Sequence, residues 1–365
     1  MKIGILTFHC AHNYGAVLQC YATQEFLKNK GYNVEIIDYR PQFLLTPYRI
    51  IDKNRFISRN LIYFVKKTII ESLMLFFRYK RWYGFESFIR NKLNLSSKVH
   101  NKNIPDYYDI YIIGSDQIWN PKITKGFDNI YFADFPFNKG KRKYLTYAAS
   151  MEIQCLSNEQ KIYLSNALKS FDQITVREKN LCELLQPLTS KKIHQVIDPT
   201  LLINSSIWEE MVTQPLINNK YVLVYQVREN ERTMQIANDI AKQIGGIVIE
   251  TVAWLNRGCF KNKYQTASPE MFLRLIKHAT CIVTTSFHGT AFSVIFNKPF
   301  YTLLLNDGRD SRSLSLLESL GLSERAISIE DVPTFSSVDF SEANIKLNQI
   351  RKDSAKIFDR LYEYS

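Results

Sequence analysis

Short apolar runs alternate with segments of helical spacing along almost the whole chain, and this alternation constrains the fold most. The runs Ile3–Thr7, Asp109–Ile113 and Tyr221–Val227 predict strands. Residues 16–29, which follow the first of these runs, have apolar residues at helical spacing and are followed by Gly31, which can end a helix. They predict a helix between two strands. Strands that alternate with helices indicate parallel sheets covered on both faces. We therefore expect an α/β fold.

The length of 365 residues exceeds what one hydrophobic core usually supports, so two domains are expected. We predict two doubly wound, Rossmann-like domains that face a cleft, the first over 1–175 and the second over 176–340. The last stretch, 341–365, has Leu347, Ile350, Ile357 and Leu361 on one face and predicts a C-terminal amphipathic helix. Ser157 and Gln160 form a capping box that begins a further helix in the first domain.

Cysteine usage and hydropathy indicate the compartment. The six cysteines are scattered without a CxxC pair, which is typical of reduced thiols. The first apolar run is too short for a signal-peptide core, and no run approaches the roughly 18 residues that a membrane helix needs. We expect a cytoplasmic protein.

The formal net charge of +12 is concentrated in 49–92, which holds eleven Lys or Arg against three acids. The same segment has apolar residues at helical spacing, namely Leu61, Val65, Ile69, Leu73, Phe76 and Phe77. Such a basic amphipathic helix can lie at the inner face of an anionic membrane or contact an acidic partner. A helix whose basic face is only solvated is the equal alternative. Nucleic acid is not expected, because no recognition motif accompanies the charge.

His288 follows a predicted strand, Cys281–Val283, and precedes a predicted helix that begins near Ala291. We therefore expect it in the turn between them, beside hydroxyls, a glycine and unpaired helix amides that favour anions. A histidine there can act as an acid or base near neutral pH. The alternative is a structural histidine held by hydrogen bonds.

In open α/β sheets ligands bind beyond the carboxyl ends of the strands. The loop Asn13–Gly15 follows the first strand and predicts a polar lining of the cleft. Asp116 and Gln117 follow another strand and can bind hydroxyls, although Asp116 can also cap a helix. Trp119, in the same loop, can stack on a sugar, but burial in the core is the favoured interpretation.

Arginines and possible metal ligands also follow the predicted strands. Arg177 follows a short strand and can pair with a carboxylate or phosphate, or with neighbouring protein carboxylates. Arg312 follows the last strand. The cluster of His9, Cys10 and His12 lacks a second group of ligands, so no metal is expected. GxGxxG, GxSxG, P-loop and HExxH motifs do not occur.

Five segments together resemble the polysaccharide pyruvyl transferase family, and they occur in the family's order. They are 7–19 with Asn13, Tyr14 and Gly15, 114–121 with Asp116 and Gln117, 175–178 with Arg177, 198–200, and 286–290 with Ser286, His288, Gly289 and Thr290. The basic segment 49–92 lies outside these motifs.

The resemblance implies a fold like the GT-B glycosyltransferases and transfer of a pyruvyl group from phosphoenolpyruvate to sugar hydroxyls. The product would be a cyclic ketal on a cell-surface polysaccharide or its lipid-linked precursor, with release of phosphate and no cofactor. It implies His288 as acid or base and a donor site with Arg177, Ser286, Gly289 and Thr290. Arg312, outside the family motifs, is a further candidate for the donor site. Asn13, Tyr14, Gly15, Asp116 and Gln117 would face the cleft or the acceptor.

Two other functions fit the same pattern. The architecture can house a glycosyltransferase with a nucleotide-sugar donor, or a non-catalytic protein that assembles or binds carbohydrate. The donor that the protein binds distinguishes a glycosyltransferase from a pyruvyl transferase. Turnover distinguishes an enzyme from a non-catalytic protein.

Overall fold

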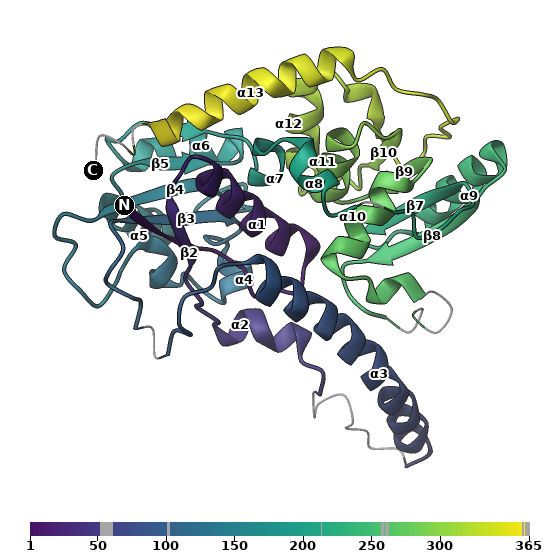
Figure 1. Cartoon of the computed structure of the whole chain (residues 1–365), viewed down its shortest axis with the longest axis horizontal. Helices are drawn as coiled ribbons and strands as arrows, with labels where there is room; N and C mark the ends of the chain where they lie inside the picture. Colours follow the sequence, from purple (N-terminus) through teal and green to yellow (C-terminus); the bar gives the residue numbers. More distant parts are fainter. Residues whose placement is uncertain are drawn as a thin grey trace.

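Two parallel sheets form the centres of two α/β domains (Figure 1). The computed structural model describes residues 1–51, 61–100, 103–212, 214–256, 259, 263–359 and 361. The first sheet has the order β2-β1-β3-β4-β5-β6. Its strands are β1 (Lys2–Leu6), β2 (Asn33–Ile36), β3 (Ile110–Asp116), β4 (Lys143–Ala149), β5 (Ile174–Val176) and β6 (Ile193–Gln195).

The second sheet has the order β11-β10-β9-β7-β8 and is also parallel throughout. Its strands are β7 (Tyr221–Gln226), β8 (Ile247–Val252), β9 (Cys281–Thr284), β10 (Phe300–Leu303) and β11 (Ala326–Ile327). The prediction of two parallel-sheet α/β domains is thus confirmed. The first sheet, however, includes β6, so it extends beyond the boundary predicted at residue 175.

The helices cover the sheets as the alternation predicts. In the first domain they are α1 (Tyr14–Asn29), α2 (Gln42–Leu45), α3 (Leu61–Lys92), α4 (Pro121–Thr124), α5 (Asn158–Ala167), α6 (Lys179–Leu185), α7 (Pro199–Leu202) and α8 (Ser205–Glu209). The later ones are α9 (Glu231–Ile244), α10 (Pro269–His278), α11 (Phe287–Ile295), α12 (Ser311–Leu320) and α13 (Ser341–Asp359). The predicted capping box of Ser157 and Gln160 begins α5. Within the described residues, no helix is long and apolar enough to cross a membrane.

Buried polar contacts hold the two domains together beside α1 and α3. The Tyr14 ring stacks on Phe272 at 4.2 Å, and its hydroxyl donates to the Ala267 carbonyl at 2.9 Å. Arg81 of α3 donates to the carbonyls of Gln265 at 2.7 Å and Ala253 at 2.9 Å. These bonds satisfy polar groups that burial would otherwise leave unpaired. They fix the position of the second domain relative to α1.

The C-terminal helix α13 returns from the second domain to the first (Figure 1). Near its end the Phe358 ring contacts the rings of Phe26 at 5.1 Å and Tyr147 at 4.7 Å. One turn earlier, Ser354 Oγ accepts a hydrogen bond from the Ile197 amide at 3.0 Å. The predicted C-terminal helix is confirmed, and it acts as a strap across both domains.

We predict that Phe358→Ala lowers the free energy of unfolding by about 3 kcal/mol, because it removes a fully buried ring and leaves a cavity. Urea denaturation of the whole chain measures the change. Ile345→Ala on the same helix is the matched control, since Ile345 is 72% exposed whereas Phe358 is 2% exposed. Equal effects of the two substitutions would contradict the role of the strap.

Candidate active site

A cavity of about 1090 Å³ lies between the two domains. The first domain contributes Asn13 and Asp116, which follow β1 and end β3, and the second contributes Arg228, His288 and Arg312. The cavity therefore opens beyond the carboxyl ends of parallel strands, where open α/β sheets bind ligands.

His288 is the second residue of α11. The Ser286 hydroxyl caps this helix by accepting from the Gly289 amide at 3.4 Å, so the helix begins at Phe287. The expected position in the turn before the helix is therefore wrong by about one helical turn. At Gly289 a Cβ would lie 2.2 Å from Thr284 Oγ1, so this glycine lets α11 approach the end of β9. The close contact of Gly289 with Thr284 holds α11, which carries the imidazole, against the end of β9.

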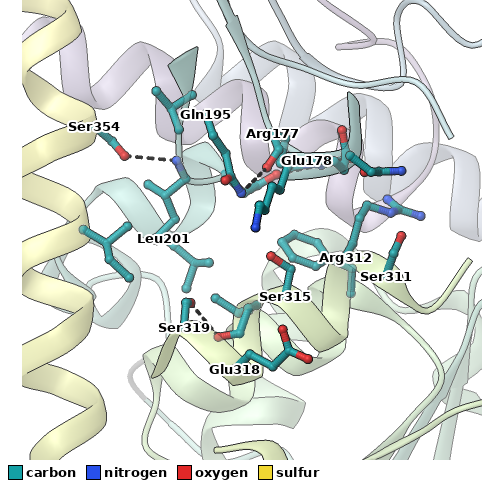
Figure 2. Close-up of a pocket in the computed structure, with 18 of the residues that line it drawn as sticks. Arg177, Glu178, Gln195, Leu201, Ser311, Arg312, Ser315, Glu318, Ser319 and Ser354 are labelled. Carbon is teal, nitrogen blue, oxygen red and sulfur yellow. Dashed lines mark hydrogen bonds and ion pairs between the residues drawn. The ribbon is translucent and has the colours of Figure 1, made fainter. Parts of the chain in front are cut away.

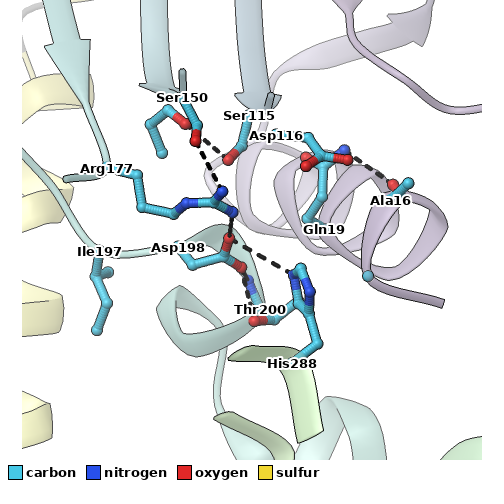
Figure 3. A network of polar contacts seen from close by, with 12 residues as sticks. Ala16, Gln19, Ser115, Asp116, Ser150, Arg177, Ile197, Asp198, Thr200 and His288 are labelled. Carbon is cyan, nitrogen blue, oxygen red and sulfur yellow. Dashed lines mark hydrogen bonds and ion pairs between the residues drawn. The ribbon is translucent and has the colours of Figure 1, made fainter. Parts of the chain in front are cut away.

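The His288 imidazole packs against the first domain. A Cβ at Gly15 of α1 would lie only 2.1 Å from His288 Nδ1, so Gly15 makes room for the ring. On another side, His288 Nε2 lies 3.8 Å from Asp198 Oδ2, as Figure 3 shows. Among the described residues, Nε2 is buried without a hydrogen-bond partner. The side chain thus comes from one domain and its surroundings from the other.

Burial lowers the pKa of His288 to about 4, because a charged imidazolium loses its hydration there. The carboxylate of Asp198 opposes this shift, whereas the Arg177 guanidinium adds to it. In the protein by itself the ring is therefore neutral at pH 7. This differs from the expectation of a histidine that titrates near neutrality.

Arg177 holds Asp198 in place. Its guanidinium donates to Asp198 Oδ2 at 2.8 Å and to Ser150 Oγ at 2.9 Å (Figure 3). It also donates to Glu178 Oε1 at 3.1 Å. Burial alone would raise the pKa of the Asp198 carboxyl, but its interactions with the His288 imidazole and the Arg177 guanidinium hold it below its ordinary value. Because His288 is neutral at pH 7, Arg177 is the charge that keeps Asp198 ionised there.

Arg312, at the start of α12, is less completely paired. Its Nη2 donates to Glu152 Oε1 at 3.3 Å, while its Nε is buried with no partner among the described residues. Burial lowers the pKa of Arg312, and the neighbouring charge of Arg177 adds to this effect. The Phe287 ring lies between the two guanidiniums, 5.2 Å from Arg177 and 5.9 Å from Arg312. Arg312 is thus a partly buried cation whose buried Nε has free hydrogen-bonding capacity.

A second cavity of about 840 Å³ adjoins the first (Figure 2). Its wall includes Gln195 at the end of β6, Ser315 and Ser319 of α12, and Ser354 of α13. Glu178 and Arg312 line both cavities. Arg312 can therefore be reached from either side.

The other residues predicted for the site divide into two groups. Asp116, Gln117, Asn13 and Ser286 line the interdomain cavity, and Asn13 also caps α1 through bonds from the Gly15 and Ala16 amides. Tyr14 and Thr290, by contrast, do not line it. Tyr14 lies in the domain interface, and Thr290 Oγ1 is buried 2.7 Å from Thr302 Oγ1.

Three further side chains from the sequence analysis pair within the protein. Trp119 is buried, as expected, and its Nε1 donates to the Tyr131 carbonyl at 2.8 Å. His9 Nε2 lies 2.8 Å from Asp38, and His12 Nε2 lies 3.1 Å from Glu86. The two histidines thus face different carboxylates.

Sequence reasoning assigned no role to several residues that shape the site. Asp198 was noted only as part of a motif, and Arg228 and Trp254 were not noted. Trp254 follows β8, is 47% exposed and stacks on Tyr48 at 5.0 Å and 8° at the cavity. Trp254 could have been found from its position just after a strand, because the rule that ligands bind beyond the carboxyl ends of strands also identified Asp116.

Two parallel-sheet domains with a polar cavity at their junction define a two-domain α/β protein whose site is shared between the domains. The chain belongs to the polysaccharide pyruvyl transferase family, whose model matches residues 13–307. Membership indicates transfer of a pyruvyl group to polysaccharide, with a saccharide as the acceptor.

Comparison with curated proteins finds no match. Similar solved structures include a UDP-GlcNAc 2-epimerase from Methanocaldococcus jannaschii, at 12% identity over 100% of both chains with a TM-score of 0.48. A functionally uncharacterised protein from Klebsiella pneumoniae is 13% identical over 69% of this chain and 86% of its own, with a TM-score of 0.41. The E. coli ADP-heptose heptosyltransferase II is 13% identical over 97% and 99%, with a TM-score of 0.31.

We predict that acidification destabilises the protein relative to its His288→Gln variant. An unfolded histidine binds a proton below about pH 6.5, whereas folded His288 does so only near pH 4. Between these values the unfolded chain binds more protons than the folded protein. The free energy of unfolding, relative to that of His288→Gln, therefore falls by up to about 3 kcal/mol as the pH is lowered. Urea titrations at several pH values measure it. His100→Gln, at an exposed position, should follow the wild type.

We also predict that Gly15→Ala displaces the His288 ring, because the added methyl group overlaps it. The displaced imidazole becomes more hydrated, so its pKa rises toward the ordinary value. Histidine-selective NMR measures the titration, with Lys28→Ala on the same helix as the control. An unchanged His288 titration in Gly15→Ala would show that the contact does not position the ring.

Proposed function

We propose that this protein transfers a pyruvyl group from phosphoenolpyruvate to two hydroxyls of one sugar, forming a cyclic ketal and releasing phosphate. The acceptor belongs to a cell-surface polysaccharide or to its lipid-linked precursor. The observation that carries the proposal is the buried His288 imidazole facing an ionised Asp198 in the cavity between the domains. Family membership supports pyruvyl transfer as the overall reaction.

The donor is an anion, and the cavity offers groups that suit it. Arg312 has a buried Nε without a partner among the described residues, so a carboxylate or phosphate oxygen would complete its hydrogen bonds. The N-termini of α11 and α12 both reach the cavity, through Ser286 and Ser311, and their partial positive charge favours anions. Arg177, already bound by two carboxylates, contributes mainly by holding Asp198 opposite His288.

The reaction needs one proton to move from a sugar hydroxyl to the donor. Neutral His288 accepts the proton of the first hydroxyl, whose oxygen bonds to the donor's central carbon. The imidazolium, stabilised by Asp198, gives this proton to the methylene carbon as the hydroxyl oxygen bonds to the central carbon, so that the π electrons of the enol form the new carbon–hydrogen bond and the methylene becomes the methyl group. The carbon–oxygen bond to phosphate then breaks, and the second hydroxyl closes the ring while its proton leaves with phosphate or solvent.

The acceptor sugar has an aromatic surface at the same cavity. Trp254 and Tyr48 come from different domains and stack on each other, with nearly half of Trp254 exposed. Aromatic faces pack against the apolar faces of sugar rings, while Asp116 and Gln117 provide acceptors and donors for hydroxyls. A sugar between these groups would lie in the same cavity as His288.

The test is phosphate release from phosphoenolpyruvate by the purified protein, with and without oligosaccharide acceptors. We expect release that depends on the acceptor. His288→Gln and Asp198→Asn should each lower it by at least about a hundredfold, because they remove the proton carrier and the charge that stabilises it. Asn can still cap α7 and Arg177 keeps its bond to Glu178, so Asp198→Asn is expected to fold, with reduced stability. His100→Gln should retain full activity.

The alternatives give different results. Binding of a nucleotide sugar without binding of phosphoenolpyruvate would replace the proposal with a glycosyltransferase. Saccharide binding without turnover of either donor would indicate a non-catalytic carbohydrate-binding protein. Full activity in His288→Gln would overturn the assigned proton transfer while leaving pyruvyl transfer intact.

A further inference from the structure

One face of α3 carries a continuous row of exposed apolar and aromatic side chains, which we call the α3 stripe. Each of its members is between 49% and 66% exposed. They are Val65, Ile69, Leu73, Phe76, Tyr79 and Tyr83. At the helical rotation of about 100° per residue they fall within about 120° of one another. Scattered exposed apolar residues are ordinary, but an aligned row of six marks an interaction surface.

The opposite side of α3 anchors the helix to the protein body. Phe85 and Ile89 are fully buried there, and Arg81 binds carbonyls of the second domain. The first half of α3 extends beyond the sheets (Figure 1). The stripe is therefore a fixed, projecting surface.

The charges around the stripe have one sign. Lys80 and Arg90 are exposed and lie on the same face of the helix as the stripe. The acids of α3, Glu71 and Glu86, are buried, and each binds an arginine or histidine of the protein. Among the described side chains of α3, the exposed charges are thus all positive.

The structure refines the expected amphipathic helix. Phe77 is only half-buried and lies outside the stripe, whereas Tyr79 and Tyr83 lengthen the stripe toward the C-terminus. Arg81, counted in the basic segment, is buried and binds the second domain. The side chain of Leu61 and residues 52–60 lie outside what the structure describes.

We propose that the α3 stripe binds the surface of an anionic lipid bilayer. Its aliphatic and aromatic side chains would enter the boundary between headgroups and acyl chains, with the tyrosine hydroxyls at the headgroups. Lys80 and Arg90 would contact lipid phosphates, and the net charge of +12 would attract the protein to the surface. A second copy of the chain is a poorer occupant, because two such faces would oppose like charges without acids between them.

The hydrogen bonds that anchor α3 also connect the α3 stripe to the interdomain cavity. The Ala253 carbonyl that Arg81 binds directly precedes Trp254 at the cavity. A membrane-bound α3 would therefore hold that side of the cavity near the bilayer. This relation rests on the proposed function, whereas bilayer binding itself does not.

Co-sedimentation of the whole protein with vesicles tests the proposal. We expect binding to phosphatidylglycerol vesicles, weaker binding to phosphatidylcholine vesicles, and weakening by salt. The double variant Leu73→Glu, Phe76→Glu should lose at least about tenfold in vesicle affinity, because it replaces inserted apolar groups by charges that lipid phosphates repel. Ile345→Glu is the matched control, since Ile345 is an equally exposed apolar residue on α13.

Several outcomes would overturn the proposal. One is the absence of binding to phosphatidylglycerol vesicles. Another is an equal loss of vesicle affinity in the double variant and in Ile345→Glu. Analytical ultracentrifugation covers the other occupant: a dimer that the double variant dissociates, without vesicle binding by the wild type, would assign the stripe to a second copy. Phosphate release with a soluble acceptor, unchanged in the double variant, separates loss of membrane binding from loss of the proposed activity.

Discussion

The buried ion pair of Arg177 and Asp198 is the interaction on which the rest of the site depends. Arg177 follows β5, and Asp198 caps α7 by accepting from the Thr200 amide and hydroxyl. Each charge needs the other as a partner, because removing one partner of a buried ion pair typically lowers the free energy of unfolding by about 3–5 kcal/mol. The pair therefore fixes the loop after β6 and presents an ionised carboxylate to the second domain.

The other half of the site reaches that carboxylate only because the His288 side chain approaches the backbone of α1 closely. His288 passes over Gly15 with no space for a methyl group between them. The approach is stable because the Tyr14–Phe272 stack and the Arg81 hydrogen bonds join the same surfaces. Packing at the interface thus sets the hydration of His288, and hydration sets its pKa. An opening of the domains would change the acidity of the ring as well as the shape of the cavity.

Local patterns in the sequence were enough for much of the fold and for the identity of the main candidate. The strand predicted at Tyr221–Val227 differs from β7 by one residue, and the capping box at Ser157 is present, because both depend on neighbouring residues. His288 was found because strand ends collect ligands. Its low pKa could not be predicted, since it arises from burial against Gly15 and from Arg177, far away in sequence. Tyr14 was placed in the cleft for the same reason, although its partners lie about 250 residues away.

Three buried polar atoms that lack hydrogen bonds in the described structure belong to residues that line the two adjoining cavities. Nε2 of His288, Nε of Arg312 and Oε2 of Glu178 are all buried without hydrogen bonds in the part of the chain described. Buried polar atoms are rarely left so, and a group of them at a cavity is typical of a site that a ligand completes. An anionic donor beside Arg312 would also favour the protonated form of His288, because its negative charge raises the pKa of a nearby imidazole. The same ring would then be a weak base while the site awaits its donor and a stronger base once that ligand is bound, so that removal of the hydroxyl proton is coupled to donor binding.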